Sequence, residues 1–166
     1  MIRSCAVVTT AVLCVFTSIS ARAADLPTET HKVLPLALAV EAAQAAIAAC
    51  KAQGYNVSVT IADRTGMPKV VLVGDGAGGF SREVTRRKAY TSALLGISTG
   101  DFTKRVAAGG FNPAVYDPQL AMGLGGVPIK VGNDTIGAIA AAGAPGGDKD
   151  EACALAGLEK ISDRLH

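Results

Sequence analysis

The sequence contains no tryptophan, and aromatic residues make up only 4% of its 166 residues. Histidine occurs twice, and neither an H-E-x-x-H nor a C-x-x-C motif is present. These absences exclude the common zinc-protease and zinc-ribbon patterns, because each of them depends on its motif. With few large rings available, the hydrophobic core must be built from small and aliphatic side chains that pack closely.

The amino terminus has the composition of a secretion signal. Arg3 is the only charge before the apolar run at residues 6–16, and Ala21-Arg22-Ala23 places small residues at the two positions that signal peptidase reads. The run is too short to span a bilayer permanently. We therefore expect residues 1–23 to be a cleaved signal peptide, with a retained membrane anchor as the alternative. Residues 24–166 then form one periplasmic or secreted domain.

The leader carries two of the 16 basic residues and none of the acidic ones, so residues 24–166 keep 14 of each and have no formal net charge. This balance gives no indication of nucleic-acid binding. Cys50 and Cys153 are the only cysteines outside the leader. In an exported protein, two cysteines 103 residues apart indicate a disulfide rather than a metal site.

Apolar periodicity and turn residues predict the order helix, hairpin, two helices, hairpin, helix. The predicted helices cover residues 33–53, 81–95, 98–108 and a last one capped by Asp148, and the predicted strands cover residues 57–62, 69–73, 126–131 and 135–142. Residues 109–124 hold Asn-Pro and Asp-Pro pairs, which predict an irregular connection or an edge strand. The order favours an α+β domain with an antiparallel sheet between helices.

In a sandwich whose first and last helices share one face of the sheet, residues on the apolar faces of these two helices become neighbours. Cys50 and Cys153 each lie on the apolar face of one of these helices, so we expect them to be neighbours and to form a disulfide. Gly157, one turn beyond Cys153, allows the two helices to approach closely.

Two features resemble binding sites. Residues 74–79 match G-x-G-x-x-G, but the preceding strand belongs to a hairpin rather than a parallel βαβ unit, so we interpret them as a flexible loop. The densest positive charge is the run Arg82, Arg86, Arg87 and Lys88 on the second predicted helix. This run is either a solvated face or a clamp for an anionic ligand such as the propionates of a tetrapyrrole. Tyr90, next on this helix, either ligates a metal or packs its ring.

Several segments of the chain resemble the GlcG/HbpS-like family, which includes the carboxy-terminal domain of PduO. The segments are Val57-Ser58-Val59-Thr60-Ile61-Ala62-Asp63, Asp75-Gly76-Ala77, Lys88-Ala89-Tyr90-Thr91-Ser92-Ala93, Gly125-Gly126-Val127-Pro128-Ile129, Ile136-Gly137-Ala138-Ile139 and Cys153-Ala154-Leu155-Ala156-Gly157. The resemblance implies a profilin-like three-layer α-β-α sandwich with a central antiparallel sheet and a tendency to form homo-oligomers. Some members of the family bind haem, and others are linked to small-molecule metabolism.

From the residues and the resemblance together we expect an exported haem- or tetrapyrrole-binding protein without nucleic-acid partners or a stable membrane span. Haem requires an apolar slot, cations for its propionates and an iron ligand. The candidates are Leu94 and Leu95 for the slot, Arg86 and Lys88 for the propionates, and Tyr90 or His31 for the iron. The alternatives are a small oxidoreductase or lyase-like enzyme acting on a small carboxylate, and an assembly module with no ligand.

Overall fold

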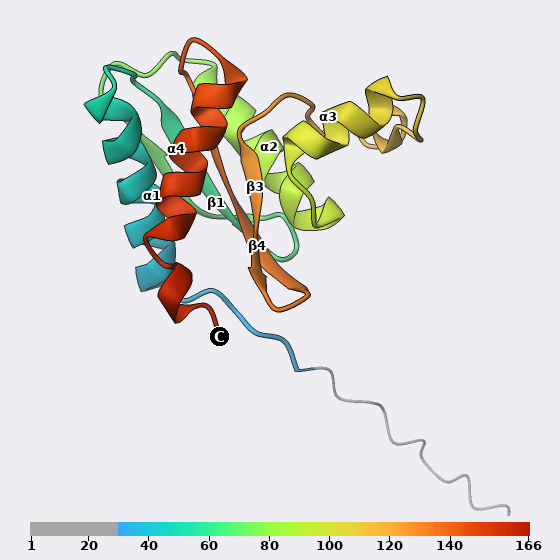
Figure 1. Cartoon of the computed structure of the whole chain (residues 1–166), viewed down its shortest axis with the longest axis horizontal. Coiled ribbons are helices and arrows are strands. Elements are labelled where there is room, and N and C mark those ends of the chain that lie inside the picture. The colour runs from blue at the N-terminus through green and yellow to red at the C-terminus, as the bar shows by residue number, and fades with distance from the viewer. Residues whose placement is uncertain (1–29) are drawn as a thin grey trace, which may run out of the picture. The chain divides into compact units, whose positions relative to one another are not determined.

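A computed structural model of the chain describes residues 30–166, so the predicted signal peptide lies outside the described residues (Figure 1). The elements are α1 (Leu36–Ala52), β1 (Ser58–Asp63), β2 (Pro68–Val73), α2 (Ser81–Leu95), α3 (Thr99–Ala107), the 3₁₀ turn η1 (Pro113–Val115), β3 (Gly126–Val131), β4 (Asp134–Ala142), α4 (Gly147–Glu159) and the 3₁₀ turn η2 (Ser162–Arg164). The predicted order of helices and hairpins is therefore confirmed. Within this part of the chain, none of the helices combines the length and apolarity needed to cross a membrane.

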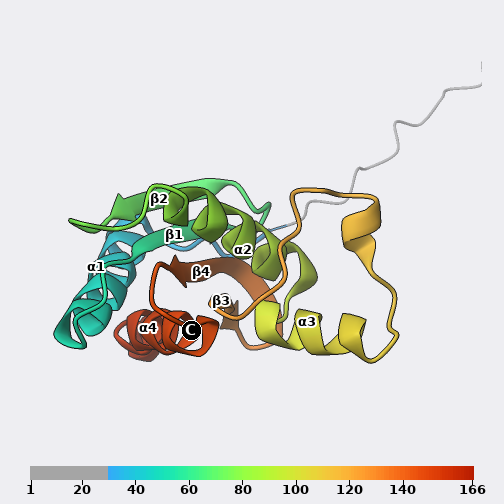
Figure 2. The same ribbon diagram turned by 90° about the horizontal axis from the view of Figure 1, so that it is seen from above.

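The four strands form one antiparallel sheet in the order β2-β1-β4-β3. Helices α1 and α4 pack against one face of this sheet, and α2 packs against the other (Figure 2). This arrangement confirms the predicted three-layer α-β-α sandwich. It follows that α2 presents its outer side to solvent on a different face of the domain from α1 and α4.

Alanine and glycine bring α1 and α4 close together. The inner side of α1 consists of Ala39, Ala42, Ala43 and Ala46, all of them fully buried. A Cβ atom added at Gly157 would lie 2.5 Å from the carbonyl oxygen of Ala42 and 2.9 Å from the Cβ atom of Ala46. Because a larger residue has no room there, the predicted role of Gly157 in the close approach of the two helices is confirmed.

The predicted disulfide joins the two helices at this contact. Cys50, near the end of α1, is bonded to Cys153 on α4, with a Cα–Cα distance of 5.5 Å. Both side chains are buried in the core. The bond closes a loop that contains all four strands of the sheet together with α2 and α3.

Replacing both cysteines with alanine is expected to lower the free energy of unfolding by up to about 4.7 kcal/mol, because the bond restricts a loop of about 100 residues in the unfolded chain. Equilibrium urea unfolding of the oxidised wild type and of the Cys50→Ala/Cys153→Ala variant measures this loss. Reductant should bring the wild type close to the variant and leave the variant unchanged. Equal stability of oxidised and reduced wild type would contradict the prediction.

Small and hydroxyl-bearing residues bring α2 close to the other face of the sheet. Two buried hydroxyl pairs connect the layers: Ser58 Oγ lies 2.7 Å from Ser81 Oγ, and Thr60 Oγ1 lies 2.8 Å from Thr85 Oγ1. Between and beyond these pairs lies a cluster of buried alanines, Ala62, Ala89, Ala93, Ala138 and Ala140. The inner side of α2 is therefore fixed in register with β1 and β4, which also fixes the direction of each outward side chain.

One local prediction is wrong. We expected the Asp148 side chain to cap the last helix, but α4 begins at Gly147 and its N-cap is Gly146, which has no side chain to bond the helix. Asp148 instead lies in the first turn of α4, where its negative charge faces the positive end of the helix dipole.

The segment at residues 109–124 is an irregular connection containing η1, which was one of its two predicted forms.

Candidate functional site

Two grooves flank the amino-terminal half of α2 on its outer side. The strand-side groove has a volume of about 370 Å³ and is lined by Val71, Val73, Arg82, Glu83 and Arg86. The loop-side groove has a volume of about 420 Å³ and is lined by Phe80, Glu83, Val84, Arg87, Leu120, Ala121 and Met122. Glu83 borders both grooves, so the side chains around it form a ridge between them.

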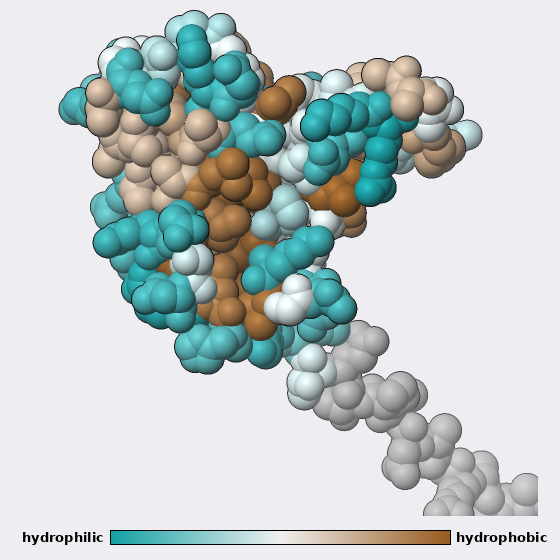
Figure 3. Space-filling view, viewed as in Figure 1, coloured by the Kyte–Doolittle hydropathy of each residue, from teal (hydrophilic) through white to brown (hydrophobic). Residues whose placement is uncertain are grey.

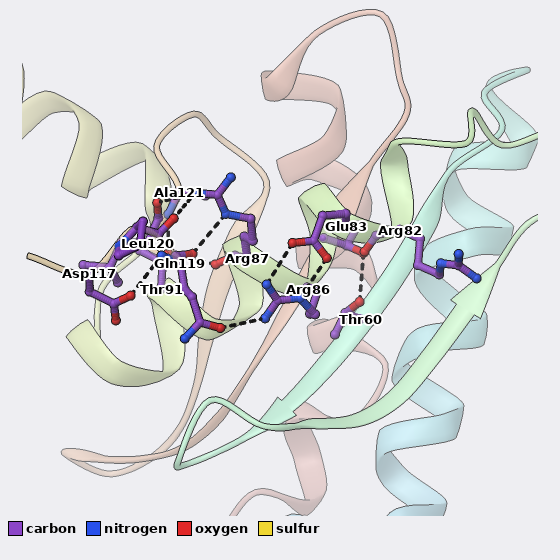
Figure 4. A network of polar contacts seen from close by, with 12 residues as sticks. Thr60, Arg82, Glu83, Arg86, Arg87, Thr91, Asp117, Gln119, Leu120 and Ala121 are labelled. Atoms are coloured by element: carbon purple, nitrogen blue, oxygen red, sulfur yellow. Dashed lines mark hydrogen bonds and ion pairs between the residues drawn. The ribbon is translucent and has the colours of Figure 1, made fainter. Parts of the chain in front are cut away.

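The ridge is an ion pair. Arg86 donates from Nε and Nη2 to the two carboxylate oxygens of Glu83, at 2.8 Å each, and from Nη1 to Gln119 Oε1 at 3.3 Å (Figure 4). The hydrogen bonds from Arg86 lower the pKa of Glu83, and those to Glu83 raise the pKa of Arg86. Both groups therefore stay charged, and the two charges largely compensate each other at the ridge.

The second wall of the loop-side groove is held against α2 by Arg87. Its guanidinium donates to the backbone carbonyls of residues 118–120 (Figure 4). One turn further along α2, Thr91 Oγ1 accepts a hydrogen bond of 2.7 Å from the backbone N–H of Ala121. These bonds hold an otherwise irregular segment in place beside the helix, so the groove does not depend on a ligand for its shape.

Lys88 lies on a different side of α2 from Arg86. Its side chain is buried, with a relative exposure of 6% for the residue, and its Nζ is 3.4 Å from Asp150 Oδ2 on α4. Asp150 also accepts a hydrogen bond of 2.9 Å from the backbone N–H of Ala144. Burial raises the pKa of Asp150, and the Ala144 N–H and Lys88 act in the opposite direction. The structure therefore does not bring Arg86 and Lys88 together on one binding surface.

Removing the cation from this pair is expected to destabilise the fold. Lys88→Met should lower the free energy of unfolding by about 3–5 kcal/mol at neutral pH, because it leaves the Asp150 carboxylate buried and unpaired. The unpaired carboxyl binds a proton more tightly in the folded state than in the unfolded state, so the loss should shrink as the pH falls from neutral. Denaturant titrations at several pH values measure this dependence.

Lys88→Met/Asp150→Asn serves as the matched control, because it removes the buried charge and retains an acceptor for the Ala144 N–H. It should be more stable than Lys88→Met at neutral pH and should lack the extra gain in acid. A deficit in Lys88→Met that is the same at every pH would contradict the assignment.

Tyr90 packs and donates a hydrogen bond. Its hydroxyl donates to Asp117 Oδ2 at 2.7 Å, and its ring lies over Gly66, where an added Cβ atom would come within 2.6 Å of Cδ2. The hydrogen bond to Asp117 raises the pKa of Tyr90, which keeps the phenol protonated. Iron binds tyrosine as the phenolate, so this environment favours the packing interpretation.

The remaining predicted residues lie away from both grooves. His31 stands five residues before α1, whose sheet face is opposite to that of α2, and it lines neither groove. Leu94 is partly exposed, and Leu95 lines a smaller groove with Ile97 and Phe111. Of the predicted propionate and iron ligands, Arg86 and Tyr90 share one side of α2 because they are four positions apart, while Lys88 between them is directed to Asp150.

Phe80 and Met122 escaped the sequence analysis as ligand contacts, whereas Arg82 belongs to the basic run that it named as a possible anion clamp. Phe80 in the loop-side groove is 70% exposed, and Met122 is 47% exposed. Arg82 lines the strand-side groove and points away from the Glu83–Arg86 pair, and its guanidinium makes no hydrogen bond or ion pair with residues 30–166 (Figure 4). A phenylalanine just before the basic run, in a chain so poor in aromatics, was an available signal for Phe80, but nothing in the pattern around Met122 indicated a role.

Two sequence motifs have structural explanations. Gly96-Ile97-Ser98-Thr99-Gly100 reads as G-x-S-x-G, a match that the sequence analysis overlooked. Ser98 is the N-cap of α3 and its Oγ accepts from the Asp101 N–H at 3.0 Å, in a link between two helices rather than the strand-to-helix turn of a hydrolase nucleophile. The loop at residues 74–79 follows a hairpin strand, as expected, so it lacks the parallel βαβ setting of a dinucleotide site.

No group of three or more His, Cys, Asp and Glu side chains within residues 30–166 has the arrangement of a metal site. The side chains that line the two grooves beside α2 can bind a ligand with an apolar body and anionic substituents. Apolar walls come from Phe80, Val84 and Met122, and positive charge comes from Arg82 and Arg87.

The structure and sequence are similar to those of HbpS. The sequence of HbpS in its crystal structure is 38% identical to this one, and the match covers 89% of this chain and 100% of the HbpS chain. The two structures superimpose with a TM-score of 0.74. A double mutant of HbpS from Streptomyces reticuli is 37% identical, covers 87% of this chain and 97% of its own, and has a TM-score of 0.73.

The fold is also shared with PduOC, whose crystal structure was determined in complex with heme. The two sequences are 20% identical, and the match covers 78% of this chain and 96% of the PduOC chain with a TM-score of 0.72. No curated protein matches the chain. Residues 34–159 match the family described as haem degrading protein HbpS-like. This match covers most of the chain and includes every strand and the four α-helices, so the protein belongs to the HbpS-like family.

Proposed function

We propose that this protein is an exported protein that binds haem or a related tetrapyrrole. The observation that carries the proposal is its membership of the HbpS-like family, with 37–38% identity to HbpS over nearly the whole chain. The fold it shares with PduOC, which has been crystallised with heme, is consistent with the same ligand class.

The loop-side groove fits one face of such a ligand. A tetrapyrrole has a flat apolar ring with two propionates on one edge, and it needs an apolar wall with cations nearby. Phe80, Val84 and Met122 supply the wall, while Arg87 supplies a positive charge within the groove. When bound, haem supplies an iron centre for redox chemistry or for binding small molecules. The chain's own contribution is to bind the ring and to fix its propionates.

Arg82 and Arg86, which line the strand-side groove across the Glu83 ridge from the loop-side groove, are the proposed propionate contacts. Arg82 has no intramolecular partner for its guanidinium among the described residues, and Arg86 borders the same strand-side groove. Lys88 and Tyr90 border neither groove, so we assign them the positioning of α2 against Asp150 and Asp117. Iron ligation by His31 stays a prediction.

Exposed aromatic residues support self-association as an additional role. Helix α3 and the segment after it project from the sandwich (Figure 1), and this arm carries Phe111 and Tyr116, which are 74% and 78% exposed and stack on each other at 5.9 Å. Apolar residues also gather over α4 and β3 (Figure 3), where Leu155 is half exposed. With no net charge on residues 24–166, electrostatic repulsion does not oppose contact between copies. We therefore propose a homo-oligomer.

Haemin titration of the purified haem-free protein tests the proposed haem binding. The wild type should show a saturable change in the Soret band. Arg82→Ala/Arg86→Ala should weaken binding about tenfold or more, because charge-assisted hydrogen bonds to the propionates are lost. The control Lys130→Ala/Lys160→Ala removes the same charge from exposed positions outside both grooves and should leave the affinity unchanged.

Light scattering on the same samples reports the number of copies. If the protein assembles but haemin titration gives no saturable change in the Soret band, the haem proposal is wrong and the ligand-free assembly module is favoured. The alternative of an enzyme acting on a small carboxylate stays a prediction without a structural observation in its favour.

Export is the other part of the proposal. The Cys50–Cys153 bond is consistent with an oxidising compartment. The intact mass of the protein recovered from the periplasm or medium should correspond to a chain that starts at or within a few residues of Ala24. A mature protein that retains Met1, or that carries lipid on Cys14, would show that this part of the proposal is wrong.

A further inference from the structure

We propose that Met122 supplies the protein atom that ligates the iron when haem occupies the loop-side groove. The inference rests on the haem binding proposed above and adds to it the identity of the iron ligand. It starts from the side chains that line the groove, because a thioether sulfur is one of the few protein groups that bind haem iron.

The other groups of this kind are engaged or lie elsewhere. Cys50 and Cys153 are bonded to each other, and the Tyr90 hydroxyl donates to Asp117. Neither histidine lines the loop-side groove, and His166 borders a groove next to α1. Among the residues that line the loop-side groove, Met122 is therefore the one with a sulfur or imidazole donor.

The backbone on both sides of Met122 is held by hydroxyl groups from two helices. The Ala121 N–H donates to Thr91 Oγ1 of α2 at 2.7 Å, and the Gly123 N–H donates to Thr103 Oγ1 of α3 at 2.7 Å. The Met122 side chain is nonetheless 47% exposed, whereas Leu120, two residues earlier, is buried. The segment thus places an apolar anchor in the domain and presents a flexible thioether to the groove from a fixed backbone.

Few other side chains that line the loop-side groove have an atom that could ligate the iron. Glu83 is the remaining lining residue with a ligating oxygen, and both of its carboxylate oxygens accept from Arg86 at 2.8 Å. Phe80 and Val84 are apolar and have no ligating atom. A soft donor next to apolar side chains suits a thioether bond to haem iron, because Phe80 and Val84 can pack against the ring while the charged Glu83 and Arg87 are engaged by other protein groups.

Substitution of Met122 in the full-length mature protein tests the inference through the spectrum of bound haem. Met122→Leu conserves volume, so it should retain haemin affinity within about tenfold. It should nevertheless change the ferric and ferrous absorption spectra and the spin state seen by electron paramagnetic resonance. Met122→His should bind haemin and give a spectrum with an imidazole ligand. The matched control is Met67→Leu, at an exposed methionine in the β1–β2 turn, and it should reproduce the wild-type spectrum.

The outcomes separate this inference from the proposed function. If wild-type protein binds haemin saturably and both Met122 variants retain its spectrum, Met122 is not the ligand while haem binding stands. If the wild type shows no saturable spectral change, haem binding itself fails and the ligand assignment fails with it. A spectral change in the Met122 variants, together with an unchanged Met67→Leu spectrum, supports the assignment.

Discussion

The close contact between α2 and the sheet is the constraint on which the site depends. Serine, threonine and alanine on the inner side of α2 leave no room for a shift, and two hydroxyl pairs fix the helix relative to β1. The same helix reaches α4 through the buried Lys88–Asp150 pair. Because its inner side is fixed in this way, the outer side can carry partly exposed phenylalanine and arginine at defined positions without contributing to the core.

Charge is distributed unevenly over this outer side. Glu83 and Arg86 compensate each other at the ridge, and Arg87 is used to hold the neighbouring segment. Arg82 alone among these arginines has no intramolecular partner within the described residues. The basic run looks uniform in the sequence, but in the structure Arg86 forms a surface ion pair, Arg87 holds a neighbouring segment and Lys88 forms a buried ion pair, while Arg82 has no partner among the described residues.

Much of the fold followed from the sequence because its signals are local. Alternating residues at 57–62 and turn residues between the predicted strands indicated the hairpins, and the helices predicted at 81–95 and 98–108 match α2 and α3 to within one residue at each end. The burial of Lys88 could not be predicted from the sequence, because its partner Asp150 is 62 positions away and only the fold brings the two residues together. Met122 gave no signal either, since residues 109–124 have no periodicity and obtain their shape from hydroxyl groups on α2 and α3.

The bond between Cys50 and Cys153 also sets an order of events in folding. Synthesis completes α1 and the β1–β2 hairpin long before α4 exists, so the alanine face of α1 has no helix to pack against for about 100 residues of chain growth. Contacts between such distant segments are slow to form because a large loop must close first. A chain truncated before α4 would keep this apolar face exposed, and such a surface is a target for chaperones and a starting point for aggregation.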